Sequence, residues 1–187
     1  MWHVLDRIAS KAAKLPLIGS LVPKSLRGKL RPYLYARSMR RLPDRRYMEA
    51  AILPGLSALG PVRVLFVGVE LYTRHYEKWF AKAGAEYWTL DVRPEVERHG
   101  AKGRHMTGSV TEADALFAGT CFDQVFLNGV FGWGVDGREA QGKTIASLRS
   151  IMKPGAVLLL GWNDNRVPEP LELAEIDAGF VHSSVAG

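Results

Sequence analysis

The chain contains a single cysteine, Cys121, so it forms no internal disulfide and no multi-cysteine metal site. It lacks any run that approaches the roughly 20 apolar residues of a membrane span. Lys11 and Lys14 interrupt the apolar segments near the N-terminus, so no tidy secretory signal is present. Together these absences predict a cytoplasmic protein.

Several patterns that carry chemistry are also missing. The five histidines are scattered, without i, i+4 pairing or cysteine neighbours, so no metal site is expected. The sequence has no P-loop, no serine-hydrolase elbow and no pair of carboxylates on one helix. The function must therefore be inferred from the order of the strands and helices and from the residues at their ends.

Positive charge is concentrated near the N-terminus. The formal net charge is +6, but residues 1–50 hold twelve lysines and arginines against three acids, a net charge of +9. The remaining residues therefore carry −3. We predict a basic helical arm or lid over residues 1–60 and a separate domain over residues 61–187.

The arm is expected to be helical. Apolar residues from Trp2 to Leu15 recur at helical spacing, a second helix is expected over Pro32–Arg41, and a third from Asp44 towards Leu56. Three interpretations stay open: a lid on the domain, a docking arm for a membrane surface or carrier protein, or a nucleic-acid contact. The third is disfavoured, because the basic residues are interleaved with apolar ones and no nucleic-acid motif is present.

One segment indicates a strand, a turn, a helix and a second strand in succession. Val62–Val67 is almost wholly apolar, as in a parallel strand covered on both faces, and Gly68 ends it. From Tyr72 the apolar residues recur at helical spacing. The second strand, Glu86–Leu90, delivers Asp91 to its carboxyl end, where ligands bind in open α/β sheets. A carboxylate there can accept both hydroxyls of a ribose, unless Asp91 is an ordinary turn residue.

The turn after the first strand discriminates between two ribose-containing ligands, the dinucleotides and S-adenosylmethionine. A pyrophosphate asks for glycines in a G-x-G-x-x-G spacing. Here Gly68 is the one glycine, and Glu70 would repel a diphosphate but not a sulfonium ligand with an ammonium group. Glu70 therefore favours S-adenosylmethionine over NAD, unless it is a solvated glutamate that complements a helix dipole.

The same pattern repeats towards the C-terminus. Further strands are expected at Arg104–Gly108, Phe122–Asn128 and Ala156–Leu160, with helices over Glu112–Phe117 and Arg138–Met152 between them. Short connections between alternating strands and helices imply parallel strands with right-handed crossovers. We therefore predict an α/β, Rossmann-like, mostly parallel sheet of about six strands flanked by helices.

From about Val62 to Asn163 the chain resembles the class I S-adenosylmethionine-dependent methyltransferases. Their fourth strand often follows F-D-x-V-x-x-N-G-V and their fifth strand follows L-K-P-G; the corresponding segments here are Phe122–Val130 and Met152–Gly155. The resemblance implies S-adenosylmethionine as the cofactor. By this resemblance, Gly68 and its neighbours would hold the methionine portion of the cofactor, and Asp91 would hold the ribose. The turn from Gly108 to Val110, which includes Ser109, would hold the adenine, and Asn128 would lie near the reacting centre. Val92 and Asn128 also belong to the predicted cofactor-binding residues.

The first motif departs from the family pattern. Members usually have an acid two residues before the first glycine and further glycines after it, where this chain has Phe66, Glu70 and Tyr72. We expect Glu70 to replace the missing carboxylate in holding the cofactor's ammonium group. Tyr72 or Thr73 is expected to bind the cofactor's carboxylate.

The C-terminal end departs as well. The family closes its sheet with an antiparallel pair of strands, but here Gly179–Ser184 is the one candidate, after a helix over Pro170–Ile176. This predicts an incomplete hairpin, because a lone strand leaves backbone groups unpaired. Three explanations stay open: the chain is truncated, the strand is loosely ordered, or another chain, as in a homodimer, supplies the partner.

Few catalytic residues are expected, because methyl transfer is an in-line displacement that depends on positioning and desolvation more than on a strong acid or base. Our candidates are Asn128, Tyr72 and Trp133. A tryptophan ring above a sulfonium stabilises it by cation–π contact, unless Trp133 covers the core instead. Other candidates at the same edge are His75, Trp162, Asn163 and Asp164.

These expectations converge on a methyltransferase that uses S-adenosylmethionine and acts on a small molecule. Two alternatives stay open. The same fold can take S-adenosylmethionine itself as substrate, in an intramolecular displacement that releases methylthioadenosine. The chain can also be a non-catalytic, methyltransferase-like module whose basic arm is its working surface.

Overall fold

The computed structural model describes residues 24–60 and 62–183. The helix expected between Trp2 and Leu15 lies outside these residues, as does the end of the strand expected at Gly179–Ser184. The chain divides into two compact units, residues 1–50 and 51–187.

The described part of the first unit, residues 24–50, is mainly helical. It contains α2 (Lys24–Met39) and α3 (Pro43–Tyr47), and a π-helix, η1 (Met48–Ile52), spans its boundary with the second unit. Pro32, expected to open a helix, lies inside α2 instead. Within this unit the guanidinium of Arg40 pairs with the carboxylate of Glu49 at 2.9 Å.

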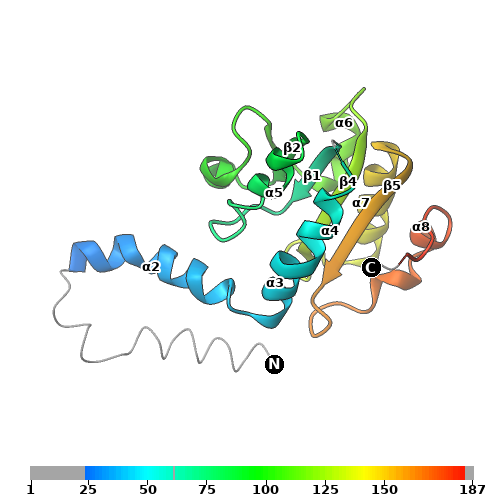
Figure 1. Ribbon diagram of the computed structural model, residues 1–187. Coiled ribbons are helices and arrows are strands. Elements are labelled where there is room, and N and C mark those ends of the chain that lie inside the picture. The colour runs from blue at the N-terminus through cyan, green and yellow to red at the C-terminus, as the bar shows by residue number, and fades with distance from the viewer. Residues whose placement is uncertain (1–23, 61, 184–187) are drawn as a thin grey trace. The chain divides into compact units, whose positions relative to one another are not determined.

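Five strands form a single sheet in the second unit. They are β1 (Arg63–Val67), β2 (Glu86–Asp91), β3 (His105–Thr107), β4 (Phe122–Phe131) and β5 (Met152–Trp162). Their order is β3-β2-β1-β4-β5, and all neighbouring strands are parallel (Figure 1). The predicted α/β, Rossmann-like architecture is therefore confirmed.

Helices connect the strands and cover both faces of the sheet. In Figure 1, α7 lies on one face, while α4 and α5 lie on the other. None of the helices in residues 24–60 and 62–183 is long and apolar enough to cross a membrane. The helices of this unit are α4 (Leu53–Ser57), before β1; α5 (Glu77–Lys82), η2 (Pro94–His99), η3 (Val110–Glu112), α6 (Ala113–Leu116) and α7 (Arg138–Ser150), between the strands; and η4 (Pro170–Glu172) and α8 (Ala174–Asp177), after β5.

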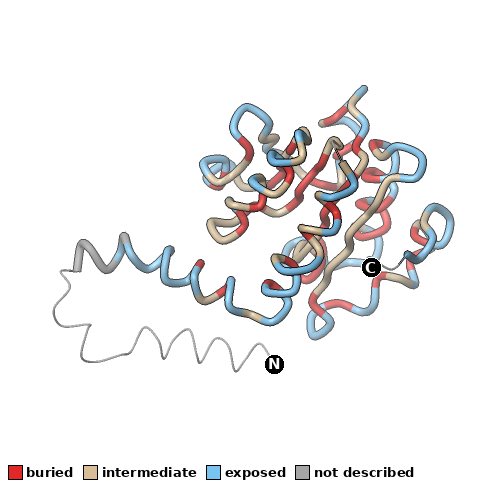
Figure 2. Tube along the Cα trace, viewed as in Figure 1, coloured by how far each residue is buried: buried red, intermediate tan, exposed pale blue. Residues whose placement is uncertain are grey.

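The alternation of side chains along the strands creates two apolar layers, one on each face of the sheet. Figure 2 shows that the central strands are largely buried, whereas β5 is only partly so. Leu65 and Val67 of β1 belong to the same buried cluster as Ile145 and Leu148 of α7. Phe66, between them in sequence, points to the opposite layer, where aromatic rings dominate. There Phe66 packs against Tyr76 and Phe126, and Phe80 of α5 packs against Tyr87 and Phe126, with centroids 5.5–5.9 Å apart.

The helix expected from Tyr72 begins later, at Glu77, and residues 71–76 form turns. The Thr73 hydroxyl donates to the Glu70 carbonyl and accepts from the Glu70 N–H, both at 3.0 Å. A threonine that bonds to nearby backbone in this way offers the chain an alternative to the helix. The helical spacing of the apolar residues therefore predicted a helix correctly but placed its first residue too early.

The C-terminal expectations were wrong in two respects. Residues 179–183 form no strand, so the sheet in the described part of the chain has five strands rather than about six. The helix expected over Pro170–Ile176 is divided into η4 and α8, because Leu173 between them has extended backbone angles. β5 is therefore an edge strand among the described residues.

Candidate functional site

The carboxyl ends of the strands bring most of the predicted site residues to one edge of the sheet. The chain reverses direction across the sheet between β1 and β4, and ligands of open α/β sheets bind in the crevice at such a point. The turn after β1 lies against the end of β4 there. A Cβ added to Gly68, whose φ is +85°, would come within 3.3 Å of the Val130 side chain. Both the backbone angle and the space therefore require a glycine at this position.

Asp91 is buried at the end of β2, with 4% of its side chain exposed. Its Oδ2 accepts a hydrogen bond from the backbone N–H of Val69 at 2.7 Å, which ties β2 to the turn after β1. Its Oδ1 accepts from the backbone N–H of Arg93 at 2.9 Å. The strand end thus holds the carboxylate in a fixed position at the predicted ribose site.

Arg93 completes this arrangement, and its role was not anticipated from the sequence. Its Nε donates to Asp91 Oδ1 and its Nη2 to Asp91 Oδ2, both at 3.0 Å. Its Nη1 donates to Glu70 Oε1 and its Nη2 also donates to the Val69 carbonyl, both at 2.9 Å. One guanidinium therefore joins the two carboxylates that were predicted to hold the ribose and the ammonium group of a cofactor.

The ion pairs change the acidity of the site. Burial alone would raise the pKa of Asp91, but hydrogen bonds from the side chain and backbone of Arg93 and from Val69 outweigh burial and lower it. Reciprocally, the hydrogen bond to Asp91 and the contact with Glu70 raise the pKa of Arg93. Asp91 is therefore ionised at neutral pH.

This lowered pKa predicts an acid-dependent stability. A carboxylate whose pKa is lower in the folded than in the unfolded chain stabilises the fold above its unfolded pKa of about 3.9, and that stabilisation is lost as pH falls through the folded pKa. We expect the melting temperature to fall between about pH 5 and pH 2, and Asp91→Asn to reduce that fall. Thermal unfolding followed by circular dichroism measures both. If the melting temperature of Asp91→Asn falls with pH as much as that of the wild type, Asp91 is not the source of the acid dependence. The control is Asp164→Asn, at an exposed acid, which should behave like the wild type.

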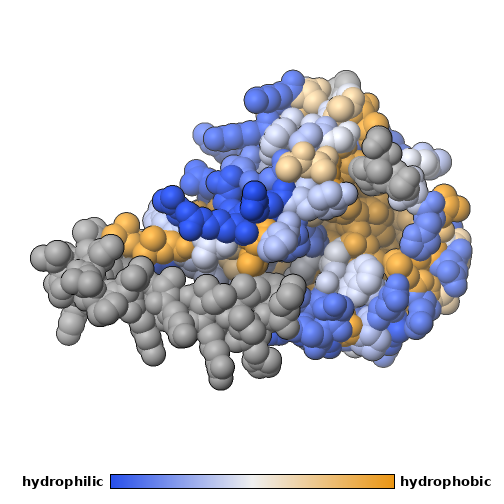
Figure 3. Space-filling view, turned by 60° about the horizontal axis from the view of Figure 1, so that its bottom comes forward, coloured by the Kyte–Doolittle hydropathy of each residue, from blue (hydrophilic) through white to orange (hydrophobic). Residues whose placement is uncertain are grey.

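The other predicted cofactor residues occupy the neighbouring turns. Thr73 is buried and its hydroxyl is engaged by the Glu70 backbone, so it shapes the turn. Ser109, at the start of η3, accepts from the Thr111 N–H at 3.3 Å, and Val110 is buried in the core. Val92, next to Asp91 in sequence, is 66% exposed. Other apolar side chains also reach the surface, and Figure 3 shows apolar patches among polar side chains.

The catalytic candidates lie on the turn after β1, within β4 and on the turn after β4. Tyr72 is half-buried on the turn after β1. Asn128 pairs with Gly161 of β5, where an added Cβ would strike the Asn128 side chain, so this glycine makes room for the amide. Trp133 is 53% exposed, and the guanidinium carbon of Arg166 lies 3.8 Å from its ring centroid. An arginine thus contacts the ring that was expected to meet a sulfonium.

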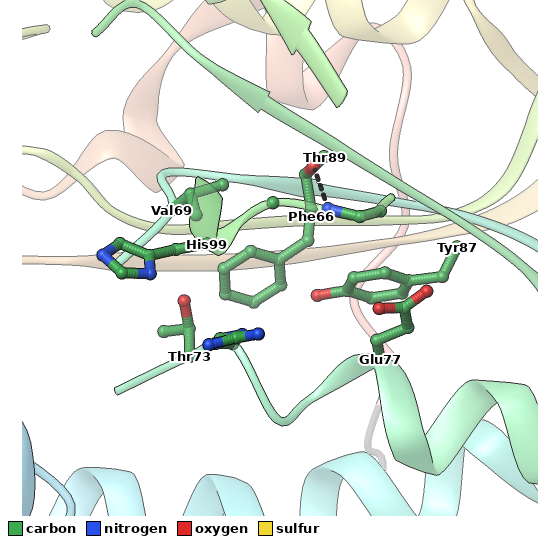
Figure 4. A pocket seen from close by; sticks show the side chains of 10 residues that line it. Phe66, Val69, Thr73, Glu77, Tyr87, Thr89 and His99 are labelled. Carbon is green, nitrogen blue, oxygen red and sulfur yellow. Dashed lines mark hydrogen bonds between the residues drawn. The ribbon is translucent and has the colours of Figure 1, made fainter. Parts of the chain in front are cut away.

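A small cavity lies beneath the turn after β1 (Figure 4). Its volume of about 10 Å³ is enough for roughly one water molecule, so it is too small for a cofactor. The Phe66 ring lines it and lies between Tyr87 and Glu77 on one side and Thr73 and His99 on the other. The Thr89 hydroxyl accepts from the Ala101 N–H at 2.9 Å and so fixes one wall. This cavity belongs to the packing under the site.

Metal ligands do not gather anywhere in residues 24–60 and 62–183: no group of three or more histidine, cysteine, aspartate or glutamate side chains is placed to hold an ion. The lack of a metal site stays a prediction.

Comparisons with known proteins identify the fold. No protein-family profile and no curated protein matches the chain. Among solved structures it is similar to a TehB-like SAM-dependent methyltransferase from Corynebacterium glutamicum, with 17% identity over 76% of this chain and 82% of the other, and a TM-score of 0.55. DesVI from Streptomyces venezuelae gives 18% identity over 67% and 55% of the two chains, with a TM-score of 0.48.

A third similar structure is the 1,6-didemethyltoxoflavin-N1-methyltransferase of Burkholderia thailandensis, with 22% identity over 66% of this chain and 60% of the other, and a TM-score of 0.39. The chain thus spans little more than half of the last two proteins. The first similarity shows that this chain shares the fold of the TehB-like SAM-dependent methyltransferase.

Proposed function

We propose that this chain is an S-adenosylmethionine-dependent methyltransferase that acts on a small molecule. The observation that carries the proposal is Asp91. It is an ionised, buried carboxylate at the end of β2, tied to a glycine turn at the point where the sheet order reverses. An acid in this position suits the two hydroxyls of a ribose, and the fold is shared with a TehB-like SAM-dependent methyltransferase.

The residues around Asp91 suit the rest of the cofactor. The exposed apolar side chain of Val92 can cover one face of an adenine, with Ser109 and Val110 at the end of the neighbouring strand. The turn at Gly68 would hold the methionine portion, with Glu70 directed towards its ammonium group. When bound, the cofactor supplies a methyl group on a positively charged sulfur.

The side chains of this protein would position rather than activate the reactants. Methyl transfer needs the acceptor in line with the sulfur–methyl bond and water excluded from both. Asn128, Tyr72 and Trp133 are the proposed positioning groups, since they lie at the carboxyl ends of β1 and β4. The basic arm over residues 1–60 is proposed to serve as a lid that selects the small-molecule substrate.

A second candidate is a non-catalytic module with the same fold. The observation in its favour is that arginines already contact the groups expected to bind a cationic cofactor: Arg93 on Asp91 and Glu70, and Arg166 on Trp133. In that case the basic arm would be the working surface, for a membrane or a carrier protein.

Product analysis separates the candidates. We expect the purified chain, incubated with S-adenosylmethionine and a library of small acceptors, to release S-adenosylhomocysteine. Liquid chromatography with mass spectrometry detects that product. Release of methylthioadenosine instead would identify an intramolecular displacement of the cofactor. Neither product, together with no binding of S-adenosylmethionine, would favour the non-catalytic module.

A further inference from the structure

Asp91 has no acceptor capacity left in this structure. An ionised carboxylate offers about four lone-pair sites. Oδ1 accepts from the backbone N–H and the Nε of Arg93, at 2.9 and 3.0 Å, and Oδ2 accepts from the backbone N–H of Val69 and the Nη2 of Arg93, at 2.7 and 3.0 Å. Four donors therefore fill four sites, and a ribose can bind to this carboxylate only if some donors leave.

The two kinds of donor differ in how readily they can leave. The N–H groups of Val69 and Arg93 belong to the backbone of the turns and cannot withdraw without unfolding the site. The guanidinium sits on a flexible side chain that is 43% exposed, and its partner Glu70 is 37% exposed. Rotation of the Arg93 side chain into solvent would leave both backbone hydrogen bonds intact.

The guanidinium also occupies the sites in the way that the proposed ligand would. It places one N–H on each oxygen of Asp91, as two neighbouring ribose hydroxyls would. It places a positive charge on Glu70, as the ammonium group of the methionine portion would. A cationic cofactor would meet repulsion from Arg93 at both carboxylates.

We infer that Arg93 is an internal competitor of the cofactor: its guanidinium holds the ribose and ammonium sites of Asp91 and Glu70, and S-adenosylmethionine binds only when that side chain swings out. This inference rests on the proposed function. The apparent affinity is then the intrinsic affinity multiplied by the open fraction of the chain. If the closed arrangement is populated about nine times in ten, the affinity is lowered about tenfold.

Two substitutions of Arg93 test this directly. Arg93→Ala removes the competitor, and we expect S-adenosylmethionine to bind about tenfold more tightly. Arg93→Lys keeps the charge, but one ammonium cannot span both oxygens of Asp91 and also reach Glu70, so a smaller gain is expected. Arg104→Ala, an exposed arginine before β3, is the matched control and should bind like the wild type.

Calorimetric titration gives the affinities, and thermal unfolding gives a second readout. Without ligand, Arg93→Ala should melt at a lower temperature than the wild type, because two carboxylates lose their cation. The rise in melting temperature caused by saturating S-adenosylmethionine should be larger in the variant. Arg93→Lys keeps the test informative if Arg93→Ala is unstable.

The possible results are distinct. If the wild type binds S-adenosylmethionine and both Arg93 variants bind it equally well or more weakly, the inference is overturned. Arg93 would then be a structural residue that supports the site. Binding by the variants and not by the wild type would support it strongly. No binding by the wild type or by either variant would overturn the proposed function itself.

Discussion

Replacement of Asp91 by asparagine is expected to weaken the binding of S-adenosylmethionine about a hundredfold. Hydrogen bonds to a charged group contribute about 1.5–3 kcal/mol each, and a neutral amide can accept only one of the two ribose hydroxyls as well as the carboxylate does. The loss is partly offset because the amide also releases Arg93, which binds Asp91 through two nitrogens. Isothermal titration of the purified variant measures the change.

The control for this experiment is Asp164→Asn, since Asp164 is an exposed acid just after β5. It should bind like the wild type. Asparagine is preferred to alanine at position 91, because it keeps the volume of a buried side chain and an acceptor for the Val69 N–H. Undiminished binding by folded Asp91→Asn would place the ribose elsewhere.

Truncation of Phe126 is expected to have the largest effect on stability. Phe126 is fully buried at the centre of β4, between the rings of Phe66 and Phe80 at centroid distances of 5.9 and 5.5 Å. Removal of a buried phenylalanine side chain costs about 3–5 kcal/mol, from lost burial and from the cavity that remains. Domains of this kind unfold with about 5–15 kcal/mol, so Phe126→Ala should lose a large share of that free energy.

Urea denaturation followed by fluorescence measures this loss. Val181→Ala is the control: Val181 is 91% exposed, and a change of less than about 0.5 kcal/mol is expected. A loss below about 1 kcal/mol for Phe126→Ala would mean that the aromatic layer is not packed as the structure shows it.

The strands and the position of Asp91 could be predicted because they depend on local patterns. A short apolar run such as Val64–Val67 fits a strand buried on both faces. Asp91 directly follows the next predicted strand, Glu86–Leu90, so it must lie at the carboxyl edge of the sheet. The alternation within β1 then decides the layers, with Phe66 on one side and Leu65 and Val67 on the other. These local patterns were enough to predict the parallel sheet and the place of Asp91 at its carboxyl edge.

The contacts at the site depend on side-chain geometry that periodicity does not encode. The delayed start of α5 comes from the Thr73 hydroxyl, which competes for the Glu70 backbone. Arg93 offered one usable signal: residues two apart in extended chain lie on the same side, so a cation two positions after Asp91 can fold back onto it. The contact between Trp133 and Arg166 joins distant segments and had no local signature.

The extent of β4 and β5 was likewise decided by pairing between distant segments. β4 was expected to end at Asn128, yet it continues to Phe131, because Phe131 pairs with Trp162 after an irregularity. The turn expected at Lys153–Gly155 lies within β5, where the register with β4 shifts between Met152 and Val157. Tertiary pairing therefore extended elements that local propensity would have ended.

The central claim is that the carboxyl edge around Asp91 binds S-adenosylmethionine, and the most direct measurement is calorimetric titration of the purified chain with S-adenosylmethionine and S-adenosylhomocysteine. We expect saturable binding of one ligand per chain, weakened in Asp91→Asn and strengthened in Arg93→Ala. Absence of binding by both the wild type and Arg93→Ala would contradict it and leave the non-catalytic module as the remaining function.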